Sequence, residues 1–103
     1  MPEVRKIFTL DGTTQSLKTF LAAQSTGITG IAMQLTYLRW RVKLGGPVAK
    51  GNSAMAALTD GDSFALDEGD TEAAYGTDRI DATQIYFRGT ANGDKVFIEC
   101  RSA

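Results

Sequence analysis

The sequence predicts an all-β fold, an antiparallel β-sandwich of the jelly-roll type, in a single domain over residues 1–103. Short segments rich in β-branched and aromatic residues recur roughly every ten residues, which is typical of a sandwich or a small barrel. Turn-forming residues separate the segments, and several of the 11 Gly lie in these turns. A chain of 103 residues fits one domain with a modest core.

The N-terminal part predicts a strand followed by a short helix. Residues 4–10 are β-favouring and end at an Asp-Gly turn. Over residues 13–24, Thr13 or Thr14 can cap a helix, and three apolar residues recur at helical spacing: Leu17, Phe20 and Leu21. A strand with an elongated loop is the alternative. Residues 1–27 are therefore expected to form either an N-terminal arm or a segment with one short helix.

Residues 28–44 carry the longest β pattern, and the pattern changes phase once. Apolar residues occupy odd positions from Ile31 to Tyr37 and even positions from Leu38 to Leu44. Because a shift of one residue turns every side chain to the other face, we expect a bulge or a bend at Tyr37-Leu38. Gly45-Gly46-Pro47 then ends the strand.

The second half predicts three shorter strands. We expect them at residues 63–66, 84–89 and 95–101. Residues 73–83 lack a clear period and are predicted to be a loop anchored by Tyr75 and Ile80. Asn92-Gly93 predicts a hairpin between the last two strands.

The composition argues against an enzyme and against a cofactor. The chain has no His and one Cys, which removes His-based acid–base chemistry, Ser-His-Asp triads, disulfides and most zinc sites. No apolar run is long enough for a transmembrane helix, and the N-terminus does not resemble a signal peptide. We therefore expect no membrane partner and synthesis in a cytoplasm.

Charge is divided unevenly along the chain. Residues 1–52 hold seven bases and two acids, whereas residues 53–103 hold four bases and ten acids. This division suits contacts between subunits, since opposite potentials steer association, although sequence halves need not coincide with faces.

Acidic turns form one candidate site. Clustered carboxylates bind hard cations such as Ca²⁺, but the spacing does not fit an EF-hand, and solvated β-turns explain it better. The weak metal candidates are Asp60, Asp62, Asp67 and Asp70.

A basic strand forms the other candidate site. The bases Arg39, Arg41 and Lys43 alternate with Trp40 and Val42, so bases and aromatic ring point to opposite faces. That arrangement and an acidic pI disfavour nucleic acid and favour a protein interface. The expected contact residues are Arg5, Lys6, Arg39, Arg41 and Lys43. Trp40 and Tyr75 are candidates for contact with a glycan.

From about residue 31 onward the chain resembles small bacteriophage virion proteins built as β-sandwiches, most of all the capsid decoration (cement) proteins. The resemblance lies in four segments: 45–49, 58–66, 81–89 and 92–100. It implies a non-enzymatic structural protein on the capsid surface of a virion, bound to the major capsid protein. A trimer or dimer of this chain is expected. The alternative that it leaves open is a tail or fibre module that binds a host-surface glycan.

Overall fold

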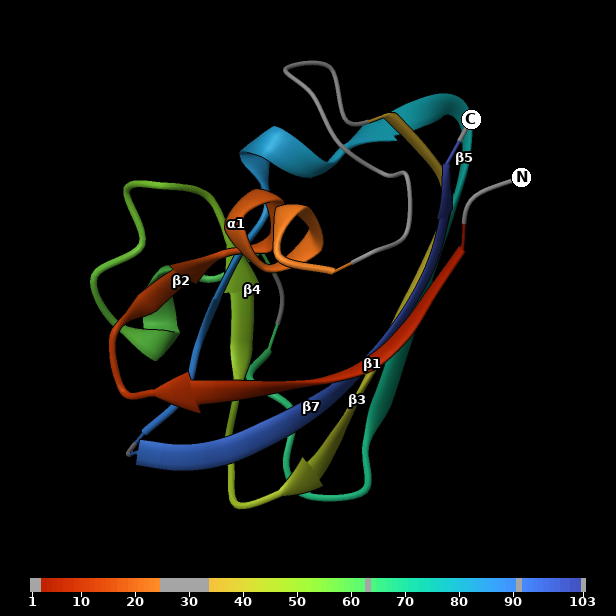
Figure 1. The fold of residues 1–103 in the computed structure, drawn as a ribbon. Coiled ribbons are helices and arrows are strands. Elements are labelled where there is room, and N and C mark those ends of the chain that lie inside the picture. The colour runs from red at the N-terminus through yellow and green to blue at the C-terminus, as the bar shows by residue number, and fades with distance from the viewer. Residues whose placement is uncertain (1–2, 25–33, 63, 91, 103) are drawn as a thin grey trace.

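The computed structural model describes residues 3–24, 34–62, 64–90 and 92–102, and gives only the backbone for 75–79 and 92. Two antiparallel sheets pack against each other, which confirms the predicted β-sandwich (Figure 1). Sheet A has the order β1 (Glu3–Asp11), β7 (Asn92–Ser102), β3 (Gln34–Leu44) and β5 (Thr71–Asp81). Sheet B has the order β2 (Thr14–Ser16), β6 (Tyr86–Arg88) and β4 (Ala49–Gly51).

The strand order is that of a jelly roll with one strand replaced. An eight-stranded jelly roll pairs its strands in the orders 1-8-3-6 and 2-7-4-5. The orders 1-7-3-5 and 2-6-4 observed here are the same, once the fifth strand is removed and the later ones are renumbered. The segment that contains the 3₁₀ turn η1 (Leu58–Asp60) takes the missing place beside β4, where Asp62 N donates to Lys50 O at 2.8 Å.

Successive strands of the chain alternate between the two sheets. The predicted hairpin at Asn92-Gly93 is therefore wrong, because β6 belongs to sheet B and β7 to sheet A. Gly93 does have a positive φ, 95°, as an Asn-Gly hairpin turn requires. That backbone conformation instead belongs to a corner where the chain passes from one sheet to the other.

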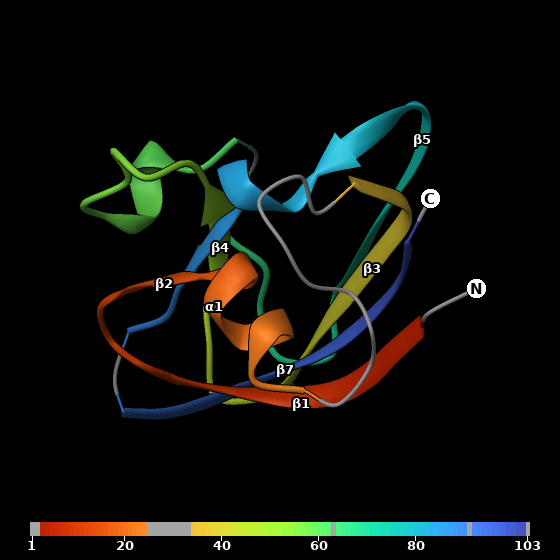
Figure 2. The same cartoon turned by 45° about the horizontal axis from the view of Figure 1, so that its top comes forward.

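The N-terminal segment combines both structures that its sequence allowed. Residues 14–16 pair with β6 as a short strand, and α1 (Leu17–Ala22) follows directly. The helix cap is Ser16, whose Oγ accepts from Thr19 N at 3.3 Å, and not Thr13 or Thr14. Thr14 is held in β2, where its hydroxyl donates to Met55 O at 2.6 Å. Figure 2 shows α1 beside the inner side of sheet A.

The predicted phase change in the long strand is confirmed. β3 shifts register against both of its neighbours between Leu35 and Tyr37, two residues before the predicted point. Beyond this bulge the even positions Leu38, Trp40 and Val42 are buried. Residues 28–33 of the predicted strand lie outside the described residues.

Two predictions for the second half are wrong. Phe64 and Ala65 form no strand, and only Leu66 makes an isolated bridge, to Val48. The segment predicted as a loop is mostly β5, an edge strand of sheet A. Its hydrogen bonds come from β3, so pairing with one neighbour compensates for a sequence that has no clear alternation of its own.

The core fills the space between the sheets and beneath α1. Trp40 and Phe87 meet edge to face with ring centroids 5.1 Å apart, and Phe8 stacks on Phe20 of α1 at 4.3 Å. Phe8 also meets the edge of Phe87 at 6.2 Å. These contacts join both sheets and the helix in one apolar cluster.

Asp94 joins two of the corners between the sheets. Its side chain is buried, with Oδ1 accepting from Gly46 N at 3.2 Å and Oδ2 accepting from Thr90 N at 2.7 Å. Gly46 lies in the β3–β4 corner, and Thr90 lies in the β6–β7 corner. A Cβ at Gly45 or Gly89 would overlap a carboxylate oxygen of Asp94, so both positions require glycine.

We expect Gly89→Ala to lower the free energy of unfolding by about 2 kcal/mol, because the added methyl group overlaps Asp94 Oδ2. Urea unfolding followed by the fluorescence of Trp40, the single Trp, measures this loss. In an Asp94→Ala background the same substitution should cost less than about 1 kcal/mol, since the clashing oxygens are gone. Equal costs in the two backgrounds would contradict the close approach.

We expect Cys100 to be inert in the native protein. Burial raises the pKa of its thiol to about 12, so only about one molecule in ten thousand carries the reactive thiolate at pH 8. Labelling with a disulfide reagent should be slow in buffer and complete in denaturant. Stoichiometric labelling of the folded protein within minutes would show that the thiol is accessible.

Candidate functional site

The face of sheet A that points away from sheet B is the candidate site, and we call it the outer face. Val4, Phe8 and Leu10 of β1 are buried against the core, so the intervening odd-numbered residues point outward. Paired residues of an antiparallel ladder share a face, which carries the outer face across β7 and β3. Its residues are Glu3, Arg5, Ile7, Thr9, Tyr37, Arg39, Arg41, Leu44, Lys95, Phe97, Glu99 and Arg101.

One end of the outer face is a network of paired charges. Glu99 of β7 lies between two arginines, 3.0 Å from Arg39 Nη1 and 3.8 Å from Arg5 Nε. Glu3 contacts Arg5 at 2.6 Å and Arg101 at 3.5 Å. Glu3 and Arg5 belong to the same strand, and the other ion pairs join neighbouring strands, so the network spans β1, β7 and β3.

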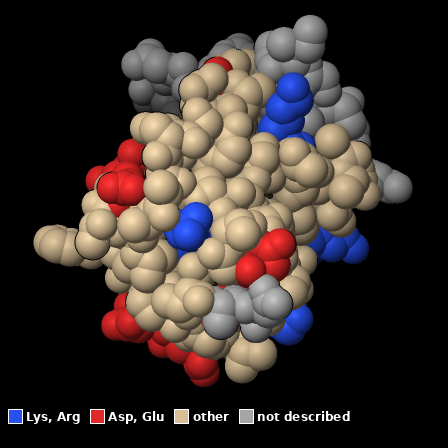
Figure 3. Space-filling model, turned by 90° about the vertical axis from the view of Figure 1, so that its left-hand side faces the viewer, with Lys and Arg blue, Asp and Glu red and all other residues tan. Residues whose placement is uncertain are grey.

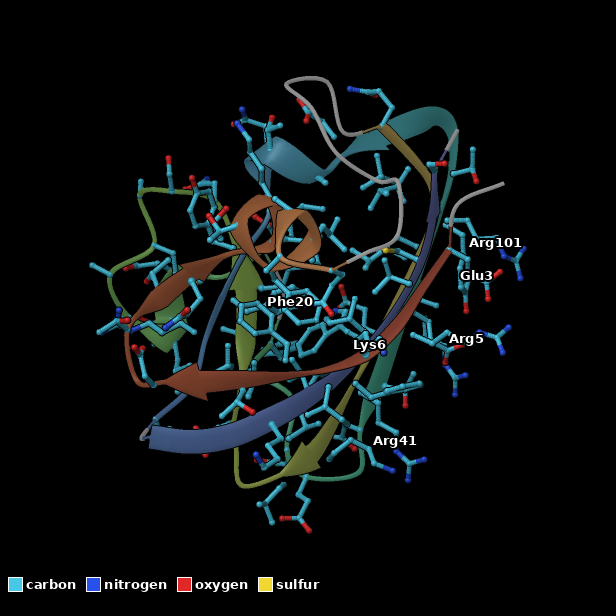
Figure 4. The ribbon with its side chains drawn as sticks, viewed as in Figure 1. Glu3, Arg5, Lys6, Phe20, Arg41 and Arg101 are labelled. Carbon is cyan, nitrogen blue, oxygen red and sulfur yellow. The ribbon has the colours of Figure 1, made fainter. Side chains whose placement is uncertain are left out.

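An aromatic ring completes this network. The guanidinium of Arg101 lies 5.2 Å from the centroid of the Tyr37 ring, within the range of a cation–π contact. Figure 4 shows Glu3, Arg5 and Arg101 projecting together from the right-hand edge of the sheet.

The other end of the outer face carries exposed apolar side chains. Ile7 is 44% exposed and is paired with Phe97, while Leu44 is 51% exposed and is paired with Lys95. Arg41 lies opposite Phe97 on the third strand and is exposed. Among the described residues, no ion pair is formed by Arg41, which leaves its guanidinium available to a partner.

The predicted basic contact residues are partly brought together. Arg5, Arg39 and Arg41 lie on the outer face in adjacent rows. Lys43 is exposed in the register shift between Val42 and Leu44, at the end of the same strand. Lys6 is not on this face, because it shares the side of Val4 and Phe8. A charge on the inward side of an edge strand discourages pairing with a foreign strand.

Trp40 cannot contact a glycan in this structure, which corrects the sequence-based expectation. The residue is 1% exposed and packs against Phe87 in the core. Its Nε1 is the single buried side-chain nitrogen or oxygen in the described part of the chain that lacks a hydrogen-bond partner. The strand alternation that brings Arg39 and Arg41 outward necessarily turns Trp40 inward. The side chain of Tyr75 lies outside the described residues.

Three of the four acidic residues predicted as weak metal ligands make local hydrogen bonds or ion pairs. Asp60 Oδ2 accepts from Ala56 N and Ala57 N, both at 3.0 Å, and Asp70 Oδ2 accepts from Asp67 N at 3.0 Å. Asp62 contacts Lys50 Nζ at 3.5 Å. Among the described residues, no three acids, cysteines or histidines lie close enough together to hold a metal ion. The carboxylates of Asp60 and Asp70 thus satisfy backbone N–H groups of their own turns.

Two further aspartates also accept hydrogen bonds from a neighbouring residue in the chain. Hydrogen bonds, first from the side chain and then from the backbone of Thr13, hold the pKa of Asp11 below its usual value. Thr83 lowers the pKa of Asp81 in the same way. Asp11, which is exposed, and Asp81, which is half-buried, are the last residues of two strands of sheet A.

Sequence reasoning missed the partners that make the outer face a network. Glu3, Glu99, Arg101 and Phe97 alternate with buried residues in their own strands, so their outward direction could have been read from the sequence. Their neighbours across the sheet could not, because β1 and β7 lie at opposite ends of the chain.

No family model, curated protein or solved structure matches this chain. Within the described residues, no helix has the length and apolar character needed to cross a membrane.

We expect Glu99→Gln to lower the free energy of unfolding by about 1 kcal/mol, because Arg39 and Arg5 lose their shared carboxylate. The loss should shrink at high salt, where exposed ion pairs are screened. Urea unfolding at two salt concentrations measures both effects. In an Arg39→Gln background the substitution should cost clearly less, and an unchanged cost would mean that the pair does not couple.

Proposed function

We propose that the protein is a non-enzymatic virion component of a bacteriophage that decorates and stabilises the capsid by binding major capsid subunits. The outer face of sheet A would be the docking surface. The observation that carries the proposal is the composition of that face: the exposed Ile7 and Leu44 flank the half-buried Phe97, and the exposed Arg41 beside them forms no ion pair with any described residue. Arginine and aromatic residues around a desolvated centre are typical of binding hot spots.

The charge of the outer face points to an acidic partner surface. Five cations and two anions lie on it, and the two anions are already paired with arginines. A carboxylate on the partner would meet Arg41, and an apolar side chain beside that carboxylate would cover Ile7 and Phe97. The pre-ordered arginines at the other end of the face would lose little side-chain entropy on binding.

The fold supports the proposal by analogy. Jelly rolls are used by viral capsid and lectin domains, and the strand order here is a variant of that architecture. The sequence resemblance to small phage virion proteins supplies the choice of a capsid as the partner. Location on the virion surface and a trimeric or dimeric state belong to the same proposal, as does the absence of a cofactor and of nucleic-acid binding.

The alternative of a tail or fibre module that binds a glycan has lost one of its two candidate residues. Trp40, which would have stacked on a sugar, is buried. No other observation on the described side chains favours the alternative, so we retain the capsid proposal alone.

Arg41→Glu should weaken binding to capsids about tenfold or more, since it removes the unpaired cation and opposes an acidic partner. Co-sedimentation of the purified protein with mature capsids that lack it measures the affinity. Capsids saturated with the wild-type protein should also resist heat better than bare capsids.

Lys18→Glu is the matched control, because it reverses an exposed charge on α1, on the other side of sheet A from the outer face. It should bind capsids as the wild type does. Equal losses in both variants would reduce the effect to net charge, and failure of the wild-type protein to bind any capsid would end the proposal.

A further inference from the structure

The two sheets have four edge strands, and an unprotected edge offers its backbone N–H and C=O groups to a foreign strand. Sheet A ends in β1 and β5, and sheet B ends in β2 and β4. Proteins protect such edges by keeping them short, by covering them, or by placing a charged side chain on the inner side. Three of the four edges of this protein show one of these devices.

Both edges of sheet B are protected. β2 has three residues, and β4 is covered by the segment that follows η1. In that segment Asp62 N donates to Lys50 O at 2.8 Å. Figure 3 faces the side of the molecule with β2 and η1, where groups of both charge signs lie among mostly uncharged atoms. This side therefore selects no partner by backbone pairing or by charge.

The two edges of sheet A differ from each other. β1 carries the exposed Lys6 on its inner side, where a charge discourages a further strand. β5 has Glu72 in that position, but Lys50 Nζ lies 3.7 Å from its carboxylate and compensates the charge. Among the described residues β5 has no second neighbouring strand. Figure 2 shows β5 at the margin of sheet A, beyond β3.

The direction of the backbone groups of β3 follows from its last contacts with the segment before β5. Val42 N donates to Asp70 O at 3.1 Å, and Val42 O accepts from Gly69 N at 2.8 Å. Both polar backbone groups of Val42 therefore point toward β5. Because this direction alternates from residue to residue along a strand, the backbone groups of Trp40 also point toward β5.

The open backbone groups of β5 can be identified from this pairing. Glu72 is the partner of Trp40, so its N–H and C=O groups are directed to β3. The N–H and C=O groups of Thr71 and Ala73 consequently point away from β3, to the open edge. Both residues are exposed. This edge therefore presents two N–H groups that no ladder among the described residues uses.

The same two residues lie on the outer face. Thr71 is paired with Arg41 and Ala73 with Arg39, and paired residues share a face. A strand added beside β5 would lie about 10 Å from β3, which is two strand spacings. Because the side chains of Thr71 and Ala73 are small, an acidic side chain of the added strand would reach over them to the arginines. Arg41 has no ion pair with a described residue, so it can accept such a partner.

The turn before β5 contains acids that already have backbone donors. Glu68 Oε2 accepts from Gly45 N at 3.1 Å, and Asp70 Oδ2 accepts from Asp67 N at 3.0 Å. Since like charges repel, an acid on the added strand is favoured opposite Ala73, which is farther along β5 from this turn than Thr71 is.

We propose that an extended segment of the capsid partner pairs with β5 along residues 71–74 and lengthens sheet A by one strand. An acidic side chain of that segment, opposite Ala73, would contact Arg39 and Arg41. The inference rests on the proposed function and names the part of the outer face that recognises the backbone of the partner. In strand addition of this kind, main-chain hydrogen bonds supply affinity and alternate side chains supply specificity.

Ala73→Pro tests the inference by co-sedimentation with mature capsids that lack the protein. Proline removes an N–H group that is directed away from β3, so the variant should fold, which Trp40 fluorescence in urea checks. Its binding to capsids should be at least tenfold weaker than that of the wild type. Ala73→Ser is the matched control, because it keeps the N–H group and a small side chain, and it should bind as the wild type does. Equal binding of Ala73→Pro and the wild type overturns the inference.

Arg41→Glu in the Ala73→Pro background tests whether both changes act on one contact. Each substitution alone should weaken capsid binding about tenfold or more. In the proline background Arg41→Glu should weaken it further by less than about threefold, because the strand that carries the opposing acid is already lost. A full additional tenfold loss would place the acid on another part of the partner and contradict the inference.

Hydrogen exchange of the wild-type protein gives a test that needs no substitution. In the free protein the N–H groups of Thr71 and Ala73 should exchange rapidly, since they lack hydrogen bonds. On capsids a peptide that covers residues 71–74 should take up fewer deuterons. Capsid binding without this added protection refutes the inference alone. A wild-type protein that binds no capsid refutes the proposed function, and the inference with it.

Discussion

The buried carboxylate of Asp94 is the interaction on which the two-sheet arrangement depends. A chain whose successive strands alternate between sheets must turn a corner after every strand, and each corner exposes backbone N–H groups that no ladder satisfies. Asp94 accepts from Gly46 N in one corner and from Thr90 N in another, 44 positions away in the chain. Hydrogen bonds to a charged acceptor are worth roughly 1.5–3 kcal/mol each, and an unsatisfied buried N–H costs a comparable amount.

This arrangement also determines which surface is left for function. Sheet B has three short strands, and with α1 it covers the inner side of sheet A. The outer face consequently remains open to solvent, on strands that are long and stiff. Its arginines are ordered by Glu3 and Glu99 from neighbouring strands, so the binding surface that we propose exists before any partner arrives.

Several local features could be predicted because their causes are local. The first strand, the bulge in β3 and the outward direction of Arg39 and Arg41 follow from apolar alternation. The mistakes arose where tertiary contacts overrode local preference. Asn92-Gly93 has hairpin chemistry but lies at a corner between sheets, and β5 has weak strand chemistry but pairs with β3. Phe64 looked like a strand residue, yet the segment around it replaces a jelly-roll strand with a 3₁₀ turn and an exposed ring.

The sequence by itself determined the all-β fold class and the face on which the residues of β3 beyond its bulge lie. These depend on period and turn chemistry, which act over a few neighbouring residues. Only the tertiary structure decided that β1 joins β7 and that β7 joins β3, which brings Arg5, Glu99 and Arg39 into one row. This strand pairing depends on packing between segments that are far apart in the chain. It depends also on the fit of the Asp94 carboxylate between Gly45 and Gly89. No window of the sequence contains both sides of such a contact.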